Sequence, residues 1–307
     1  MIIKMFKILI ILITIFILVN LYLHFSIKKR DIENRYPPNI LPEINLDIEL
    51  PNVEWVKNIP KKIYRTHEDP QRLEPYREVL EKTEKLLPQY ETEIFYKEDR
   101  EKFIKDKYGD RIYNAYMAID PNYGPAKADF FRYLIVYYYG GIYLDIKSGP
   151  VKNLDKILEK TEGRMALSNW TNFPVGILPV YHYNELYWSS FIDSYYGEYQ
   201  NWFVISGAGN PMLGKIIKQV VSNIEAGLKN INFYKAGHYS VIAMTGPLMI
   251  TMVIDKYQKE EKDSIIIFKN FLDNHLKYKV IDHKKIEKSK HYSKNKNKNV
   301  LKIDKND

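Results

Sequence analysis

The stretch from Gly124 to Asp155 constrains the fold most, because a long apolar pattern, a glycine pair and a short strand pattern follow one another there. From Ala126 to Tyr139 nearly every side chain is apolar or aromatic, which predicts a helix that is buried on most of its surface. Gly140-Gly141 then predicts the end of this helix, since glycine accepts left-handed backbone geometry. Ile142 to Ile146 predicts a short core strand, which Ser148-Gly149-Pro150 ends.

Few charged residues interrupt this apolar block, and they mark the candidate site. Asp129 and Arg132 stand three residues apart, so a helix places them on one face. Asp145 and Lys147 come at the end of the predicted strand, and ligands of open α/β sheets bind beyond the carboxyl ends of strands. A structural alternative stays open, in which Asp129 and Arg132 form a buried ion pair and Asp145 shapes a turn. The joint spacing of these residues with the glycine pair favours the functional interpretation.

The same residues carry a family resemblance. The pattern A-x-x-D-x-x-R-Y followed by Y-G-G-x-Y-x-D-x-D resembles the sugar-binding DXD region of glycosyltransferase family 32, which includes mannosyltransferases. Lys147 stands where many members carry the second aspartate. The residues that match are Ala126, Asp129, Arg132, Tyr133, Gly140, Gly141, Tyr143 and Asp145. The resemblance implies an α/β, GT-A-like (Rossmann-like) domain that transfers a hexose from a nucleotide sugar with retention of configuration.

Two further segments extend the resemblance to the donor site. Ile59 to Thr66 is similar to the family segment I-P-K-x-I-H-Q-T, whose strand end contacts the nucleotide. Trp202 to Ser206 is similar to a segment whose following loop faces the donor, and this loop begins with Gly207. The implied catalytic residues are Asp145 and Lys147. The implied donor-binding residues are Thr66, Ala126, Asp129, Arg132, Tyr133, Asp145 and Gly207.

The resemblance also implies a divalent cation, usually manganese, that bridges the diphosphate and the second aspartate. Lys290-His291-Tyr292 resembles a late histidine motif, which makes Asp145 and His291 the candidate metal ligands. Two hypotheses follow: either the metal is retained through these residues, or Lys147 replaces part of its charge. We favour retention, because one lysine supplies about half the formal charge of a divalent ion. A solvated histidine in a lysine-rich segment explains His291 equally well.

The N-terminus predicts a membrane anchor. Residues 8–25 carry no formally charged side chain, and at helical rise they span roughly 27 Å, close to the hydrocarbon thickness of a bilayer. We therefore expect a transmembrane segment with its flanks over residues 1–30 and a proline-containing stem over 31–58. A GT-A-like domain would follow over 59–276. The family resemblance implies a single-pass type II protein with its domain in a Golgi- or ER-type lumen, or the equivalent compartment of another host.

The 307-residue chain has a formal net charge of +8 and no cysteine, which excludes disulfides and thiolate chemistry. The last segment, residues 277–307, carries a net charge of +7, so the basic balance belongs to the C-terminus. We expect a nucleotide-sugar donor, GDP-mannose or a UDP-sugar, a glycan, glycolipid or polysaccharide acceptor, and no nucleic acid. One rival is a catalytically inactive relative that binds carbohydrate or scaffolds a partner. Another is a basic protein that binds membrane surfaces or nucleic acid.

Overall fold

The computed structural model describes residues 12–22, 42–169, 198–230, 238–268, 274–281 and 299–302. The chain divides into two compact units, Met1–Ile40 and Leu41–Asp307. In the first unit, residues 12–22 are helical. Within the described ranges, no helix combines the length and the apolar character needed to cross a membrane.

A four-stranded sheet forms the centre of the second unit, in the order β2-β1-β3-β6. Its strands are β1 (Lys62–Thr66), β2 (Glu91–Phe95), β3 (Gly141–Leu144) and β6 (Phe203–Ser206). Strand β1 runs parallel to both β2 and β3, whereas β6 runs antiparallel to β3 with Gly141 opposite Ser206. The predicted α/β class is confirmed, and two of the three strand pairings in this sheet are parallel.

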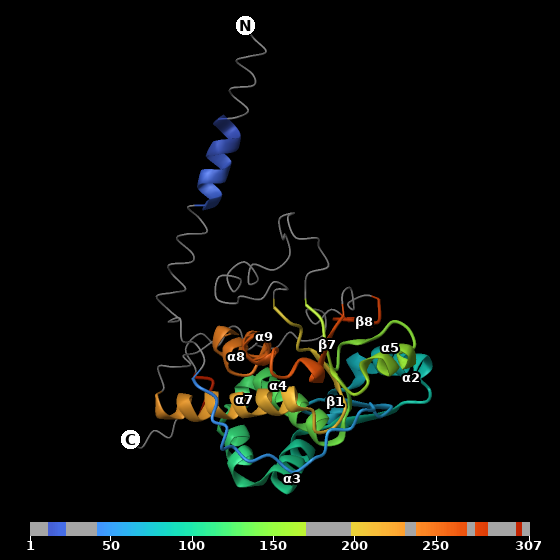
Figure 1. The fold of residues 1–307 in the computed structure, drawn as a ribbon. Coiled ribbons are helices and arrows are strands. Elements are labelled where there is room, and N and C mark those ends of the chain that lie inside the picture. Colours follow the sequence, from blue (N-terminus) through green and yellow to red (C-terminus); the bar gives the residue numbers. More distant parts are fainter. Residues whose placement is uncertain are drawn as a thin grey trace. The chain divides into compact units, whose positions relative to one another are not determined.

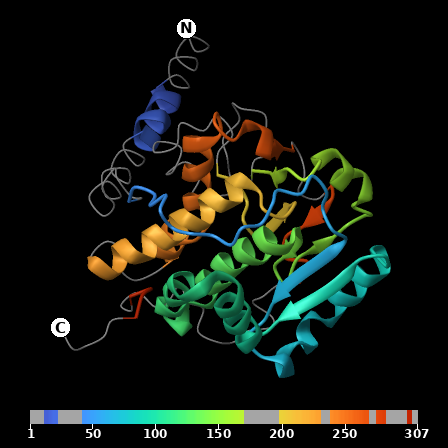
Figure 2. The ribbon, with the colours of Figure 1, turned by 60° about the horizontal axis from the view of Figure 1, so that its bottom comes forward.

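Helices cover both faces of this sheet (Figure 1). On one face, α4 (Gly124–Tyr139) packs on β1, β3 and β6, and α7 (Pro211–Lys229) packs on α4. Helix α3 (Lys97–Ala118) lies beside α4 and α7, as a turned view shows (Figure 2). On the other face, α5 (Asp155–Thr161) contributes Ile157 and Leu158 to an apolar cluster with Ile142 and Leu144 of β3.

Shorter elements complete the unit. They are the helices α2 (Arg77–Leu86), α8 (His238–Met244) and α9 (Pro247–Tyr257), the strands β4 (Gly149–Pro150), β5 (Met165–Leu167), β7 (Ile265–Ile267) and β8 (Leu276–Lys277), and 3-10 turns at Pro70–Arg72, Glu74–Tyr76, Pro121–Tyr123 and Lys262–Ser264. Strands β4 and β8 pair antiparallel, and β5 and β7 pair parallel.

The predicted helix, glycine pair and strand of the central block are confirmed, with one difference at the strand end. Gly140 has φ 69°, and a Cβ there would lie 2.8 Å from the Ala208 backbone nitrogen, so only glycine fits. Strand β3 ends at Leu144 rather than at Ile146. The reason is a turn in which the Ser148 N–H donates to the Asp145 carbonyl over 2.8 Å. Asp145 therefore lies just beyond the strand.

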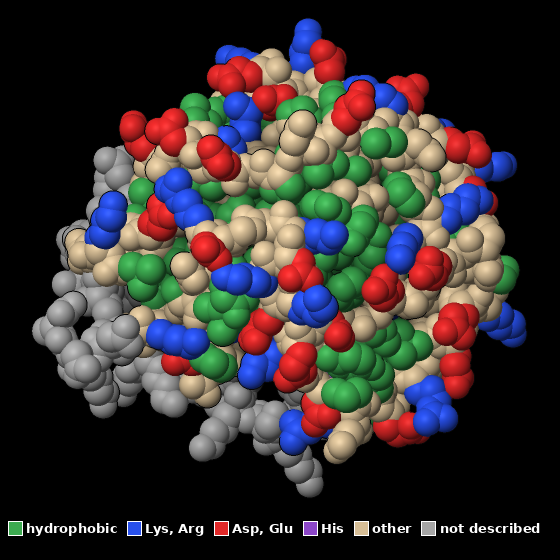
Figure 3. Space-filling view, turned by 90° about the horizontal axis from the view of Figure 1, so that it is seen from below, with side chains coloured by type: hydrophobic (Ala, Val, Ile, Leu, Met, Phe, Trp, Pro, Cys, Tyr) green, Lys and Arg blue, Asp and Glu red, His purple; other side chains and the backbone are tan. Residues whose placement is uncertain are grey.

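The compact unit extends beyond the predicted limits of 59 and 276. In the predicted stem, the Val56 N–H donates to the Ala208 carbonyl over 3.0 Å, and Ile48 is fully buried. At the other end, β8 pairs with β4, so the start of the basic segment belongs to the folded domain. On the face seen from below, Lys and Arg side chains are interspersed with Asp and Glu (Figure 3).

Candidate functional site

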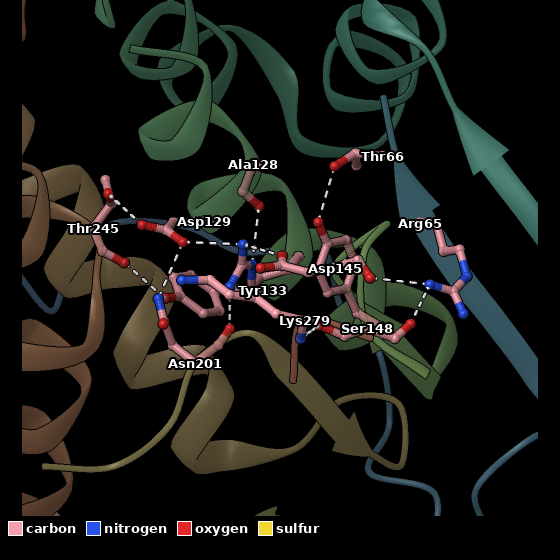
Figure 4. Close-up of polar contacts among 12 residues, drawn as sticks. Arg65, Thr66, Ala128, Asp129, Tyr133, Asp145, Ser148, Asn201, Thr245 and Lys279 are labelled. Carbon is pink, nitrogen blue, oxygen red and sulfur yellow. Dashed lines mark hydrogen bonds and ion pairs between the residues drawn. The ribbon is translucent and has the colours of Figure 1, made fainter. Parts of the chain in front are cut away.

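Two parallel strands bring their carboxyl ends to one edge of the sheet. Thr66 ends β1, and Asp145 follows the last residue of β3. The Thr66 and Tyr143 hydroxyl groups are hydrogen-bonded over 2.9 Å, which joins the two strand ends. The Asp145 N–H donates to the Trp202 carbonyl over 2.9 Å and so ties this edge to the start of β6. Figure 4 shows the residues that gather here.

Arg132 of α4 connects two carboxylates at this edge. Its Nη2 atom lies 2.8 Å from Asp145 Oδ1 and 3.1 Å from Asp129 Oδ1, and its Nη1 donates to the Asn201 carbonyl. Burial lowers the pKa of Arg132, but the carboxylates of Asp145 and Asp129 more than offset this and raise it above its ordinary value. The Asp145 side chain is 20% exposed against 4% for Arg132, so Asp145 is the more accessible partner.

Asp129 is the buried member of this cluster. Asn201 Nδ2 donates to its Oδ1 over 3.0 Å, and the Thr245 hydroxyl donates to its Oδ2 over 3.2 Å. Burial raises the pKa of Asp129 to about 7, and the neighbouring Arg132 opposes that rise. Tyr133 is held next to it, because its hydroxyl donates to the Thr245 carbonyl over 2.7 Å.

Arg65 supports the turn that carries Asp145 and Lys147. Its fully buried guanidinium donates to the Asp145 carbonyl over 3.0 Å and to the Ser148 carbonyl over 2.7 Å. A third bond, from Nη2 to the Thr83 hydroxyl over 3.0 Å, ties the turn to α2. Burial lowers the pKa of Arg65 to about 10. The side chain therefore positions the turn from beneath, where it contacts backbone rather than solvent.

The structure brings together most, but not all, of the predicted donor-binding residues. Asp129, Arg132 and Asp145 form one ion-paired cluster, which Tyr133 joins through Asn201. Thr66 reaches it through Tyr143, whose ring centroid lies 4.9 Å from the Arg132 guanidinium carbon. Ala126 is fully buried in α4, where its methyl group packs in the core. Lys147 lies in the turn after β3, and its carbonyl accepts a hydrogen bond from the Val280 N–H over 2.9 Å. His291 lies outside the described residues.

The structure places Gly207 away from this site, which corrects the sequence prediction. Strand β6 is antiparallel to β3, so its carboxyl end, Ser206, pairs with Gly141 at the amino end of β3. Gly207 consequently lies at the edge opposite Asp145. A Cβ on Gly207 would lie 2.0 Å from the Val56 carbonyl oxygen, so the glycine allows the 42–58 segment to pack closely.

Sequence reasoning missed functional partners at the other end of β6. Asn201 and Trp202 precede this strand, and its antiparallel direction brings them to Asp129 and Asp145. Thr245, which follows α8, is a further direct hydrogen-bond partner of Asp129. A polar residue just before a buried strand was the available signal for Asn201.

The described residues do not fit the metal site that a DXD motif implies. Lys147 replaces the second carboxylate, and a protonated lysine donates hydrogen bonds but has no lone pair for a metal. Oδ1 of Asp145 already accepts from Arg132. No group of three or more His, Asp or Glu side chains suited to a metal occurs within the described part of the chain. The second motif position is thus cationic where the motif calls for an oxygen ligand.

This arrangement suits the binding of a polyhydroxylated ligand. Carboxylate oxygens at a strand end accept hydrogen bonds from hydroxyl groups, and Arg132 fixes the orientation of both carboxylates. The asparagine, threonine and tyrosine partners hold the buried end in place. The exposed part of Asp145 is the group that can contact a ligand.

Residues 74–163 match the family described as the glycosyltransferase sugar-binding region containing DXD motif. Residues 74–163 are thus similar to the DXD-type sugar-binding region, which confirms the resemblance to glycosyltransferase family 32.

Two curated relatives come from Schizosaccharomyces pombe. The chain is 24% identical over 225 residues to inositol phosphoceramide mannosyltransferase 2, a match that covers 72% of this chain and 53% of the relative. It is 27% identical over 251 residues to the initiation-specific alpha-1,6-mannosyltransferase, covering 78% and 58%. The chain thus spans just over half the length of these relatives. Among solved structures, the PaToxG glycosyltransferase is 18% identical with a TM-score of 0.44, covering 78% of this chain and 80% of that one.

Proposed function

We propose that this protein transfers a hexose, with mannose favoured, from a nucleotide sugar to a glycan, glycolipid or polysaccharide hydroxyl, with retention of configuration, through a GT-A-like domain. The observation that carries the proposal is the Asp129–Arg132–Asp145 cluster at the carboxyl ends of β1 and β3. The names of the two relatives support mannose as the sugar.

In the proposed reaction, the Asp129–Arg132–Asp145 cluster binds and orients the donor while the bonds at the anomeric carbon change. The bond between the anomeric carbon and the phosphate oxygen breaks, and its electron pair stays on the diphosphate. The acceptor oxygen forms the new bond to the anomeric carbon, and its proton passes to the released diphosphate. Asp145 accepts hydrogen bonds from donor hydroxyl groups, while Arg132 and Asp129 hold its carboxylate in place.

A donor-hydrolysis screen on the full chain tests this function. GDP-mannose, UDP-glucose, UDP-galactose and UDP-N-acetylglucosamine would each be incubated with Mn²⁺ and with a chelator, because the DXD-type region implies a divalent cation. We expect turnover of one donor and a loss of at least about 100-fold for Asp145→Asn, whose amide nitrogen donates where the carboxylate accepted. A folded protein that binds a sugar nucleotide but hydrolyses none would instead support the inactive relative.

We also propose that residues 8–25 anchor the protein in a membrane as a type II single span. The run of 18 residues without a formal charge supports this localisation. Fractionation of expressing cells followed by alkaline carbonate extraction tests it. The full chain should stay in the membrane pellet, and a variant with two aspartates in this run, Ile13→Asp combined with Ile17→Asp, should move to the supernatant.

A further inference from the structure

The turn after β3 and the segment after β8 bring two lysines to one aromatic ring. Strands β4 and β8 pair with Gly149 opposite Lys277, and the Val280 N–H donates to the Lys147 carbonyl over 2.9 Å. The Lys147 ammonium lies 5.4 Å from the centroid of the Tyr278 ring, and the Lys279 ammonium lies 4.9 Å from it. Two lysines from distant parts of the sequence thus lie at one aromatic ring, and Lys147 and Lys279 are called the lysine pair below.

This lysine pair is anchored next to the candidate donor site. The Tyr278 ring packs on Trp202 with 5.3 Å between ring centroids, and the Trp202 carbonyl accepts the Asp145 N–H. Burial raises the pKa of Tyr278, and the nearby Asp145 carboxylate raises it further, which agrees with their closeness. The Lys279 N–H contacts the Ser148 hydroxyl over 3.4 Å, in the turn that Arg65 supports from beneath (Figure 4).

The backbone at Lys279 is unusual. Lys279 has φ 52°, in the left-handed region that residues with a side chain seldom adopt. Such strained positions concentrate at ligand-binding sites, where the surrounding structure holds them in place. Here the pairing of β4 with β8 and the bond from Val280 to Lys147 hold the backbone on either side.

We propose that Lys147 and Lys279 bind the diphosphate of the nucleotide donor in place of the divalent cation that a DXD motif would hold. This inference rests on the proposed function. Two ammonium groups supply the formal charge of one divalent ion, and lysine binds phosphate as a compact point charge. The pair neutralises the negative charge that collects on the diphosphate as the glycosidic bond breaks. Under this proposal, Lys147 at the second motif position keeps the diphosphate-binding site functional, although it cannot ligate a metal ion.

Nucleotide binding to the full chain, measured by isothermal titration calorimetry, tests the proposal without turnover. GDP and UDP would be titrated with Mn²⁺ and with EDTA, and GMP and UMP would serve as ligands that lack the diphosphate. We expect the diphosphate that binds to have an affinity in EDTA within about threefold of that in Mn²⁺. Lys147→Gln and Lys279→Asn should each weaken its binding about tenfold or more, with a smaller effect on the monophosphate.

The variants are chosen to preserve the fold. Asparagine tolerates the left-handed backbone at position 279, so Lys279→Asn removes the charge with little added strain. Lys277→Gln is the matched control, because Lys277 is an exposed lysine of the adjoining strand β8, and its affinity should stay that of the wild type. Lys147→Asp restores the second aspartate, and its diphosphate binding should become dependent on Mn²⁺.

Two outcomes would overturn the inference. One of them contradicts the lysine pair alone, and the other also contradicts the proposed function. Diphosphate binding that requires Mn²⁺ in the wild type and is indifferent to both lysine variants overturns the lysine pair and leaves the transferase proposal intact. Absence of GDP and UDP binding under every condition, with the protein shown to be folded by circular dichroism, overturns both.

Discussion

Lys127 is a buried lysine on α4 whose ammonium donates to the Tyr116 carbonyl over 3.0 Å and lies 4.0 Å from the Tyr116 ring centroid. Burial lowers the pKa of Lys127 to about 8, with a smaller contribution from Lys302. In the unfolded chain the ammonium keeps its proton up to its ordinary pKa near 10.5. Between these two values the unfolded state binds more protons, so the free energy of unfolding rises with pH in that window.

We therefore predict a pH-dependent difference between the wild type and Lys127→Met. From pH 7 to pH 10 the wild type should gain up to about 3 kcal/mol of stability relative to the variant. The reason is that the Lys127 ammonium loses its proton in the folded state, so a charge is no longer buried. Urea unfolding at several pH values measures this. Lys127→Arg is the control, since a guanidinium stays charged throughout and should show no such gain. Parallel curves for wild type and Lys127→Met would contradict the prediction.

At the scale of elements, the loop after β6 has a structural role that can be separated from ligand binding. Gly207→Ala should lower the free energy of unfolding by about 3 kcal/mol, because the new methyl group meets the Val56 carbonyl oxygen at 2.0 Å. The affinity of the remaining folded protein for its nucleoside diphosphate should stay unchanged. Thermal unfolding and calorimetry on the same sample measure both quantities.

Gly124→Ala is the matched control for this substitution. Gly124 has helical backbone angles, and a Cβ there would have no neighbour nearer than the Glu68 Oε1 atom at 3.9 Å, so the variant should keep the wild-type stability to within about 0.5 kcal/mol. If Gly207→Ala had normal stability but weakened nucleotide binding, the prediction would be contradicted and Gly207 would belong to the donor site.

The same loop shows what the sequence could and could not predict. Apolar periodicity and the glycine pair located α4 and β3, and the parallel direction of β1 and β3 put Asp145 at the expected edge. Such local patterns do not show whether a strand pairs parallel or antiparallel, because a short buried apolar run is compatible with either direction. The antiparallel course of β6 therefore moved Gly207 out of the site and brought Asn201 into it.

Long-range pairing accounts for the other omissions. The strand pattern around Arg65 does not indicate the role of its side chain, which crosses beneath the sheet edge and holds the turn around Asp145. Lys279 was counted with a basic terminal segment, since nothing local links it to a turn so much earlier in the chain. The sequence thus predicts the part of the site that lies between Gly124 and Asp155. The other contributions depend on tertiary contacts that local patterns do not reveal.

At the scale of the whole molecule, the segment from residue 42 to 58 joins the sheet to α7 although the sequence suggests a stem. Its Trp55 Nε1 donates to the Gly163 carbonyl over 3.1 Å, its Leu46 carbonyl accepts from Lys218, and its Ile48 is fully buried. A chain that starts at residue 59 loses all three contacts, while one that starts at residue 42 keeps them.

We predict that removal of residues 1–41 leaves the thermal stability of the domain unchanged, whereas removal of residues 1–58 lowers its melting temperature by about 10 °C. Loss of one buried isoleucine and several hydrogen bonds amounts to about 3 kcal/mol, which corresponds to a shift of this order in a domain of this size. Scanning fluorimetry of both truncated chains measures it. Equal melting temperatures would mean that the segment rests on the domain without stabilising it, and that the folded domain begins at the predicted residue 59 rather than at 42.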